Sequence, residues 1–268
     1  MEQLIQNRVD VDGSWVTVDV YGDPDAPAIV VIPGAMADAA AWSAVARHLD
    51  GPAVAVVNRR GRHPSGPLTG TYGLTTEVAD AAAVLRRFAD VRALFGWSYG
   101  GLIALRLADT VAVPQVIAYE PVMAPFGAEA LPDLRRADEA ADRDAVVEVA
   151  LRQVTGMPDE AVRALRADAA TWAELRRLGA PAYAETRAVN EAPQPAALAT
   201  RAARVDLIVG ERNRGRAPYG TSFEDVARHV PAANVHELSD QGHLAHLEAP
   251  AHLAALVNRL LLDQAARI

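Results

Sequence analysis

The chain has 268 residues, of which 51% are hydrophobic and 22% are charged, as in an ordinary globular protein with one large domain or a core plus an insertion. Cysteine is absent, which excludes thiol nucleophiles, disulfides and cysteine-ligated metals. All 26 basic residues are arginine, which excludes Schiff-base chemistry on lysine. The net charge of −8 is opposite in sign to the footprint of a nucleic-acid-binding protein, so we expect no nucleic-acid partner.

The sequence also lacks signals for secretion or membrane insertion. The first residues have no cationic start followed by an apolar stretch, and no apolar run approaches the roughly 20 residues that span a bilayer. We therefore expect a cytoplasmic protein without a membrane partner. No feature of the sequence indicates an oligomeric state.

Short apolar runs bounded by Gly, Pro and Asn alternate with longer segments of helical period, which predicts an α/β protein with a mostly parallel sheet. Residues 15–20 alternate at period two and predict an outer antiparallel strand. The other predicted strands, most of them apolar as strands covered on both faces should be, are residues 28–32, 53–57, 91–95, 116–119, 205–209 and 235–238. Helical period is clear in residues 75–88, 101–108 and 250–262.

Residues 125–200 show no strand pattern, and their composition turns to Ala, Arg, Asp and Glu with helical spacing. We predict that this segment is a helical cap over the strand ends. Residues 1–124 and 201–268 would then form the core domain. Pro193 and Pro195 mark an extended return to the sheet.

The strongest local signal is the segment Gly96–Gly100, which fits G-x-S-x-G directly after an apolar strand and directly before a helical segment. A sharp strand-to-helix turn of this kind exposes the serine oxygen above the sheet, and the two glycines permit close backbone approach. The alternative is a glycine-rich turn whose serine only caps a helix. The strand–turn–helix context favours Ser98 as a nucleophile.

A serine hydroxyl is a weak nucleophile until a neighbouring base takes its proton, so a histidine is needed. His243 lies on a loop after the last predicted strand and before the last predicted helix, where the turn at Gly242 directs it toward the strand ends. His246 is expected to begin the helix and to pack or be solvated. The other five histidines lie on predicted helices, in a strand or in a loop, and we expect structural roles for them.

With these residues the chain resembles the α/β-hydrolase family over nearly its whole length, from Ile29–Gly34 through Ser98 to Gln241–His243. The resemblance implies an eight-stranded sheet with a helical cap inserted after the sixth strand. This cap coincides with residues 125–200.

The resemblance also implies an oxyanion hole. One donor would be the backbone N–H of Tyr99, and the other would be that of Ala35, with Met36 or Gly34 as alternatives for the second position. The segment Asn58–Arg62 resembles the family's Asp-x-Arg-Gly loop, but its leading Asp is replaced by Asn. We assign that loop no chemistry.

The acid of the expected triad departs from the common pattern. Much of the family carries an Asp at the end of a Gly-x-x-Asp after the seventh strand, and here Asn213 stands in that place; an amide cannot stabilise an imidazolium as a carboxylate does. Some members, including haloalkane dehalogenases and mycotoxin-lactone hydrolases, carry the acid after the sixth strand, where this chain has Glu120. The alternatives are Glu211, Asp206 or no acid, with Glu120 as a structural carboxylate that pairs with an arginine under the cap.

The identity of the nucleophile narrows the chemistry, because dehalogenases and epoxide hydrolases of this fold need an Asp at position 98. We predict a cofactor-independent serine hydrolase of a carboxylic ester or lactone, in which Ser98 attacks the carbonyl, His243 transfers the proton and Glu120 orients His243. No histidine spacing typical of a metal site occurs, so no metal is predicted. The alternatives are a thioesterase, a carbon–carbon bond hydrolase, or a non-catalytic ligand-binding protein of the same fold.

Bulky apolar residues around the expected entrance predict an apolar small-molecule substrate. The candidate substrate-contacting residues are Trp97, Met36, Met123, Phe126, Trp172 and Tyr183. The alternative for each residue is that it packs cap helices together.

Overall fold

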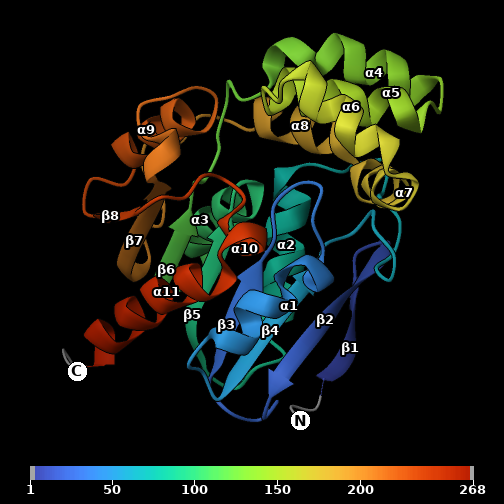
Figure 1. Ribbon diagram of the computed structural model, residues 1–268. Coiled ribbons are helices and arrows are strands. Elements are labelled where there is room, and N and C mark those ends of the chain that lie inside the picture. Colours follow the sequence, from blue (N-terminus) through green and yellow to red (C-terminus); the bar gives the residue numbers. More distant parts are fainter. Residues whose placement is uncertain (1–3, 266–268) are drawn as a thin grey trace.

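The computed structural model of the protein describes residues 4–265, with side chains as far as residue 261 (Figure 1). Its eight strands form one sheet in the order β1-β2-β4-β3-β5-β6-β7-β8. β2 runs antiparallel to both of its neighbours, β1 and β4, and every other neighbouring pair is parallel. The strands are β1 (Leu4–Val11), β2 (Ser14–Gly22), β3 (Ala28–Ile32), β4 (Ala53–Asn58), β5 (Val91–Trp97), β6 (Val113–Tyr119), β7 (Ala202–Gly210) and β8 (Asn234–Leu238). The predicted fold class is confirmed.

One strand was absent from the sequence-based prediction. β1 pairs with β2 from Leu4 opposite Tyr21 to Val11 opposite Ser14, so β1, and not the strand at residues 15–20, is the outer strand. Val9 is the one fully buried side chain of β1. Because its other side chains are exposed or half-buried, β1 lacks the alternation of apolar and polar residues that identifies a strand from sequence.

Two apolar cores lie on the two faces of the sheet, and β3 shows how the strand period divides its side chains between them. Val30 and Ile32 belong to the core that contains α2 (Leu74–Leu85), α3 (Tyr99–Thr110) and α9 (Tyr219–Arg228). Ile29 and Val31 belong to the other core, with α1 (Ala39–His48), α10 (Ala245–Glu248) and α11 (Pro250–Ala265). Successive strand residues point to opposite faces, so an apolar run such as β3 requires helices on both sides.

Five α-helices are inserted between β6 and β7. They are α4 (Leu131–Glu139), α5 (Arg143–Val149), α6 (Asp159–Ala167), α7 (Ala169–Gly179) and α8 (Ala182–Glu191), and we call them the cap helices. In Figure 1 they gather at the top of the view, beyond the end of the sheet at which β6 leads into them. The insertion after the sixth strand agrees with the predicted fold class, whereas the division into a core and a cap at residues 125 and 200 stays a prediction.

Aspartate side chains cap the N-termini of three helices. The side chains of Asp38, Asp142 and Asp168 accept hydrogen bonds from first-turn N–H groups of α1, α5 and α7. Such caps satisfy donors that have no intrahelical acceptor, and each contributes about 1 kcal/mol to helix stability. Among the helices of residues 4–265, none is long and apolar enough to cross a bilayer.

Candidate active site

Ser98 occupies the turn between β5 and α3 in a strained backbone conformation. Its φ of 55° and ψ of −122° lie in a region that non-glycine residues rarely adopt. Hydrogen bonds hold the turn on both sides: the Ser98 N–H donates to the Tyr119 carbonyl at 3.0 Å, and the Ser98 carbonyl accepts from Gly101 N–H at 3.0 Å. The strain is therefore fixed by the neighbouring strand and by the first turn of α3.

The glycines of the G-x-S-x-G segment are required by close backbone contacts. A Cβ at position 96 would lie 2.4 Å from the Gly100 carbonyl oxygen, and a Cβ at position 100 would lie 2.0 Å from the Ile32 carbonyl oxygen. No side chain can be accommodated at either position without moving backbone. Close packing of the turn on β3 thus explains the motif in this chain.

The loop after β3 packs directly against Ser98. A Cβ on Gly34 would lie 2.8 Å from the Cβ of Ser98, so the segment that contains Ala35 adjoins the nucleophile candidate. Within residues 4–265 the Ala35 N–H donates no hydrogen bond to another protein group. Tyr99 is the first residue of α3, and first-turn N–H groups have no intrahelical acceptor. Among the described residues, neither the Ala35 nor the Tyr99 N–H donates a backbone hydrogen bond.

Strand register brings Glu120 next to Ser98. β5 and β6 are parallel neighbours with Trp97 opposite Tyr119, so the residues that follow these two leave the sheet at the same level. Glu120 is fully buried, has a φ of 41°, and donates its N–H to the Ile208 carbonyl of β7 at 2.8 Å. A second strained residue is therefore held at the end of the strand next to the Ser98 turn.

The described donors around the Glu120 carboxylate come from the end of β7 and from the segments that follow β7 and β8. Oε1 accepts from the Gly210 N–H at 2.9 Å and from Asn213 Nδ2 at 3.0 Å. Oε2 accepts from Asn213 Nδ2 at 2.9 Å and from the His243 ring at 2.6 Å. Asn213, in the position where much of the family has its acid, therefore donates to both oxygens of the Glu120 carboxylate. An Asp there would place a second negative charge against Glu120.

The contact with Glu120 sets the tautomer of His243. A carboxylate only accepts, so His243 Nδ1 carries the proton and Nε2 presents a lone pair. Burial lowers the pKa of His243, although Glu120 opposes the shift, and the ring is neutral near pH 7. Within the described residues no hydrogen bond joins the Ser98 hydroxyl to this ring; such contacts often tighten only in the substrate complex.

Aromatic residues hold the His243 ring and its loop. The ring of Tyr219, at the start of α9, stacks on the His243 ring with 3.5 Å between centroids and 13° between planes. Trp97 Nε1 donates to the His243 carbonyl at 2.9 Å, and the Tyr119 hydroxyl donates to the Gly242 carbonyl. Two neighbouring strand ends therefore fix the backbone of the His243 loop.

The two other carboxylates considered for the acid have different partners. Glu211 is exposed and accepts from the Asp240 N–H at 2.8 Å. Asp206 is buried in the middle of β7 and accepts from Gln115 at 2.7 Å, from Arg204 at 2.7 Å and from His236 at 2.9 Å. Neither of these carboxylates contacts the His243 ring.

His246 packs inside the protein, which is one of the two outcomes expected for it. Its ring stacks on Trp42 with 4.8 Å between centroids and lies 4.2 Å from that of Trp97. Burial, and secondarily the neighbouring His243, lower the pKa of His246 to about 3. His246 therefore contributes an uncharged ring to the core at neutral pH.

A comparison with known protein families identifies the family of this chain. The family model described as the alpha/beta hydrolase family matches residues 29–256, which is most of the chain. The chain belongs to the alpha/beta hydrolase family. A search of curated proteins returned no match.

Solved structures share the hydrolase fold at low sequence identity. An alpha/beta hydrolase from Sphaerobacter thermophilus is 20% identical with a TM-score of 0.74, and the alignment covers 96% of this chain and 99% of that one. A carboxylesterase structure from Nitrososphaera gargenis has 18% identity, a TM-score of 0.73 and coverages of 98% and 100%. An epoxide hydrolase from Vigna radiata has 14% identity, a TM-score of 0.71 and coverages of 97% and 98%. At these identities the likeness concerns the fold alone.

Two of the candidate substrate-contacting residues of this hydrolase-family chain lie near His243. Trp97 is buried, and its ring centroid is 4.8 Å from that of His243. Phe126 lies one ring further out, 5.7 Å from Tyr219, which itself stacks on His243.

The other four candidates pack within or beside the cap helices. Trp172 is buried among them and donates its indole N–H to Asp144 at 2.9 Å, and Tyr183 packs against the neighbouring apolar cluster. Met36 contacts both of these clusters, and Met123 is buried where the chain leaves β6. Contacts between these six residues and a substrate stay predictions.

Tyr219 carries no sequence signal for its place at the site. It is the first residue of α9, far along the chain from both Ser98 and Glu120, and only the tertiary fold brings its ring onto His243. Asn213 was singled out as a missing acid, yet its role as a donor to Glu120 depends on a contact between segments more than 90 residues apart. Both residues are visible only in the folded chain.

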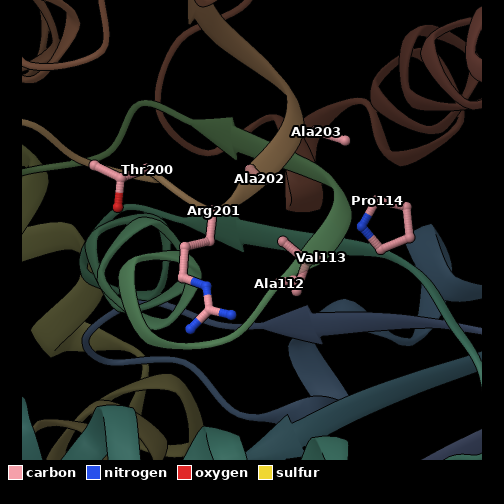
Figure 2. A pocket seen from close by; sticks show the side chains of 7 residues that line it. All are labelled: Ala112, Val113, Pro114, Thr200, Arg201, Ala202 and Ala203. Atoms are coloured by element: carbon pink, nitrogen blue, oxygen red, sulfur yellow. The ribbon is translucent and has the colours of Figure 1, made fainter.

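A hollow of about 470 Å³ lies at the opposite end of the sheet, where β6 and β7 begin (Figure 2). Its one charged lining residue, Arg201, donates to the Thr110 carbonyl at 3.0 Å.

Within residues 4–265 no three His, Asp or Glu side chains are grouped to hold a metal ion. We therefore take the residues around Ser98 as the candidate active site.

Proposed function

We propose that the protein is a cofactor-independent serine hydrolase that cleaves a carboxylic ester or a lactone through an acyl-enzyme. The observation that carries the proposal is the 2.6 Å hydrogen bond between His243 Nδ1 and Glu120 Oε2, at the strand end next to Ser98. A histidine held in this tautomer offers Nε2 as a general base. A strained serine at a helix N-terminus supplies the nucleophile.

In this mechanism His243 Nε2 takes the Ser98 hydroxyl proton while the serine oxygen attacks the carbonyl carbon. The negative charge that develops on the carbonyl oxygen is stabilised by the N–H groups of Ala35 and Tyr99. His243 then gives its proton to the leaving alkoxide, and the acyl group stays on Ser98. A water molecule, deprotonated by His243 in the same way, attacks the acyl carbonyl; the bond to Ser98 then breaks, His243 returns the proton to the serine oxygen, and the carboxylic acid is released.

Glu120 and Asn213 act together in the proposed triad. The Glu120 carboxylate keeps the proton on Nδ1 and stabilises the imidazolium that forms during attack. Asn213 donates to both carboxylate oxygens and so fixes their orientation without competing for the histidine proton. The carboxylate thus comes from β6 in place of the loop after β7.

Covalent labelling with a fluorophosphonate tests the proposal against the non-catalytic alternative, because this reagent reacts only with an activated serine. We expect one phosphonyl group per chain, located by mass spectrometry on Ser98, and none on Ser98→Ala. Ser43→Ala, a change on the surface helix α1, is the matched control and should label like the wild type. An unlabelled wild-type protein would favour a ligand-binding role.

A panel of p-nitrophenyl esters, thioesters and lactones of increasing acyl length tests the substrate class. We expect turnover of apolar esters or lactones, with a dependence on acyl length, because Phe126 and Trp97 are the apolar groups nearest His243. Preferential turnover of thioesters would replace the ester and lactone assignment with a thioesterase.

A further inference from the structure

Two arginines and two glutamates form a buried cluster under the loop that follows β3. Arg59 and Arg62 follow β4, Glu77 lies on α2 and Glu185 lies on the cap helix α8; each is at most 2% exposed. The two cations match the two anions, and this balance is what permits such charges in a core. The proposed function does not use this cluster, and the sequence indicated no chemistry for Arg59 or Arg62.

Arg59 holds two successive carbonyls of the loop that adjoins Ser98. Its Nε donates to the Pro33 carbonyl at 2.9 Å, and its Nη2 donates to the Gly34 carbonyl at 2.7 Å. Peptide groups are planar and trans, so the C=O and N–H of each group point in opposite directions. With both carbonyls turned toward Arg59, the N–H groups of Gly34 and Ala35 are turned away from it.

The same guanidinium also lies against the residue on the other side of the proposed oxyanion hole. Its central carbon is 5.0 Å from the centre of the Tyr99 ring. One side chain therefore contacts both segments that supply oxyanion donors. The planar, five-donor geometry of arginine suits this arrangement, whereas a lysine ammonium has no fixed plane.

The cap helices close on the same group. Glu185 accepts from Arg59 at 2.6 Å and from both terminal nitrogens of Arg62 at 2.6–2.7 Å, and Arg62 Nε donates to the Leu178 carbonyl of α7 at 3.0 Å. On the core side, Glu77 accepts from Arg59 at 2.8 Å. If the cap moved away, two buried arginines would lose the carboxylate they share, which is costly in a low-dielectric interior.

The pKa values of the two glutamates shift in opposite directions, because Glu185 contacts two arginines and Glu77 contacts one. Burial alone would raise the pKa of Glu185, but Arg59 and Arg62 outweigh it and hold that pKa below its ordinary value. Burial raises the pKa of Glu77, which has a single arginine partner. Glu185 is therefore ionised at neutral pH when it contacts Arg59 and Arg62.

We propose that Arg59 is a positioning residue that orients the Gly34–Ala35 peptide for the oxyanion hole, and that docking of the cap through Glu185 completes this arrangement. The catalytic consequence rests on the proposed function. The orientation of the peptide does not, because it is a property of the protein without substrate.

Arg59→Met tests the proposal, with Arg60→Met as the matched control. Arg60 is as buried as Arg59 and pairs with Asp80 at 2.6 Å, but it contacts neither loop carbonyl and no cap helix. For Arg59→Met we expect kcat to fall about 10- to 100-fold with KM nearly unchanged, because the lost stabilisation belongs to the transition state. Arg60→Met should lose comparable stability and keep most of its kcat.

Two further variants separate positioning from general destabilisation. Arg59→Lys should recover only part of kcat, because an ammonium cannot hold two carbonyls in a fixed plane. Glu185→Gln keeps the shape of the side chain and removes its charge, so it tests the cap contact even if Arg59→Met does not fold. We expect a loss of kcat in Glu185→Gln that is smaller than in Arg59→Met. Equal kcat losses in the Arg59 and Arg60 variants would overturn the proposal.

A crystal structure of the unliganded Arg59 variant that folds, Arg59→Met or otherwise Arg59→Lys, tests the same point without activity. We expect the Gly34–Ala35 peptide to be rotated there and to keep its orientation in Arg60→Met. An unchanged peptide in the Arg59 variant would overturn the proposal. A wild-type protein that neither labels nor turns over esters would contradict the proposed function alone, because the peptide orientation would still decide the role of Arg59.

Discussion

His243 and His246 lie three residues apart, and both are buried against the same tryptophan ring. The difference between them is the partner of Nδ1. His243 donates from Nδ1 to the Glu120 carboxylate, whereas His246 Nδ1 finds no hydrogen-bond partner in the described part of the chain. Burial lowers both pKa values, but only at His243 does a carboxylate oppose the shift. A carboxylate that can stabilise the imidazolium is what makes a buried histidine suitable for proton transfer.

The largest expected effect comes from replacing these histidines one at a time. His243→Gln should lower kcat by about 10⁴-fold or more, because no other group can take the serine proton. His246→Phe preserves an aromatic ring against Trp42 and should keep kcat within a factor of about three of the wild type. Steady-state kinetics with an activated ester measures both, and comparable losses in the two variants would contradict the different roles given to them.

A second comparison concerns Phe126 and Trp172. Phe126 adjoins Tyr219, which stacks on His243, whereas Trp172 is buried among the cap helices. Phe126→Ala should change the preference for bulky over short acyl groups by about 10- to 200-fold, which is the range for apolar pocket contacts. Trp172→Phe should affect all substrates alike. Ratios of kcat/KM for a short and a bulky ester measure this, and a larger selectivity change in Trp172→Phe would reverse the assignment.

The position of the acid can be tested by moving it. Asn213→Asp in the Glu120→Gln background places a carboxylate where much of the family has one, in contact with the side chain at position 120. We expect kcat to recover by about tenfold relative to Glu120→Gln, because the new carboxylate can address the same imidazole. Asn213→Asp alone should be less active than the wild type, since two adjacent carboxylates repel each other. Single-turnover rates report both outcomes; no recovery would show that His243 is accessible only from β6.

The smallest expected effect is on stability as a function of pH. The pKa of His246 is about 3 in the folded protein and has its ordinary value near 6.5 in the unfolded chain. Between these values the unfolded chain binds the additional proton, so stability is lost as the pH falls from 6.5 toward 3. His246→Phe should remove about 1–2 kcal/mol of the loss between pH 6.5 and pH 5. Urea denaturation at both pH values measures the free energy of unfolding. An equal loss of this free energy between pH 6.5 and pH 5 in the variant and the wild type would contradict the low pKa.

Local sequence patterns predicted the turn at Ser98 and most of the strands, because these features depend on residues that are close together in the chain. G-x-S-x-G after an apolar run identified the turn at Ser98. Period-two alternation identified β2, and short, mostly apolar runs identified the six strands β3 to β8. Glu120 was singled out through the resemblance to family members that carry the acid after the sixth strand. Whether Glu120, Glu211 or Asp206 meets the histidine depends on side-chain direction, which register and tertiary packing determine.

One strand and the contacts that join distant segments were not predicted from the sequence. β1 was missed because seven of its eight side chains are not fully buried and no apolar alternation results. The contacts of Arg59 and Arg62 with Glu185 join residues more than 120 positions apart, and charged residues in such sequences more often lie on solvated helix faces. Only the folded chain shows that these four charges are buried together.

The most direct test of the triad is the kcat of Glu120→Gln compared with that of Glu211→Gln, measured on one activated ester. Glutamine at position 120 keeps the size of the side chain but neither enforces the histidine tautomer nor stabilises the imidazolium, so kcat should fall about 10³- to 10⁴-fold. Glu211 is exposed and contacts the Asp240 backbone, so its substitution should leave kcat nearly unchanged. The reverse pattern would place the acid after β7, and two silent substitutions would mean that Ser98 and His243 act without a carboxylate.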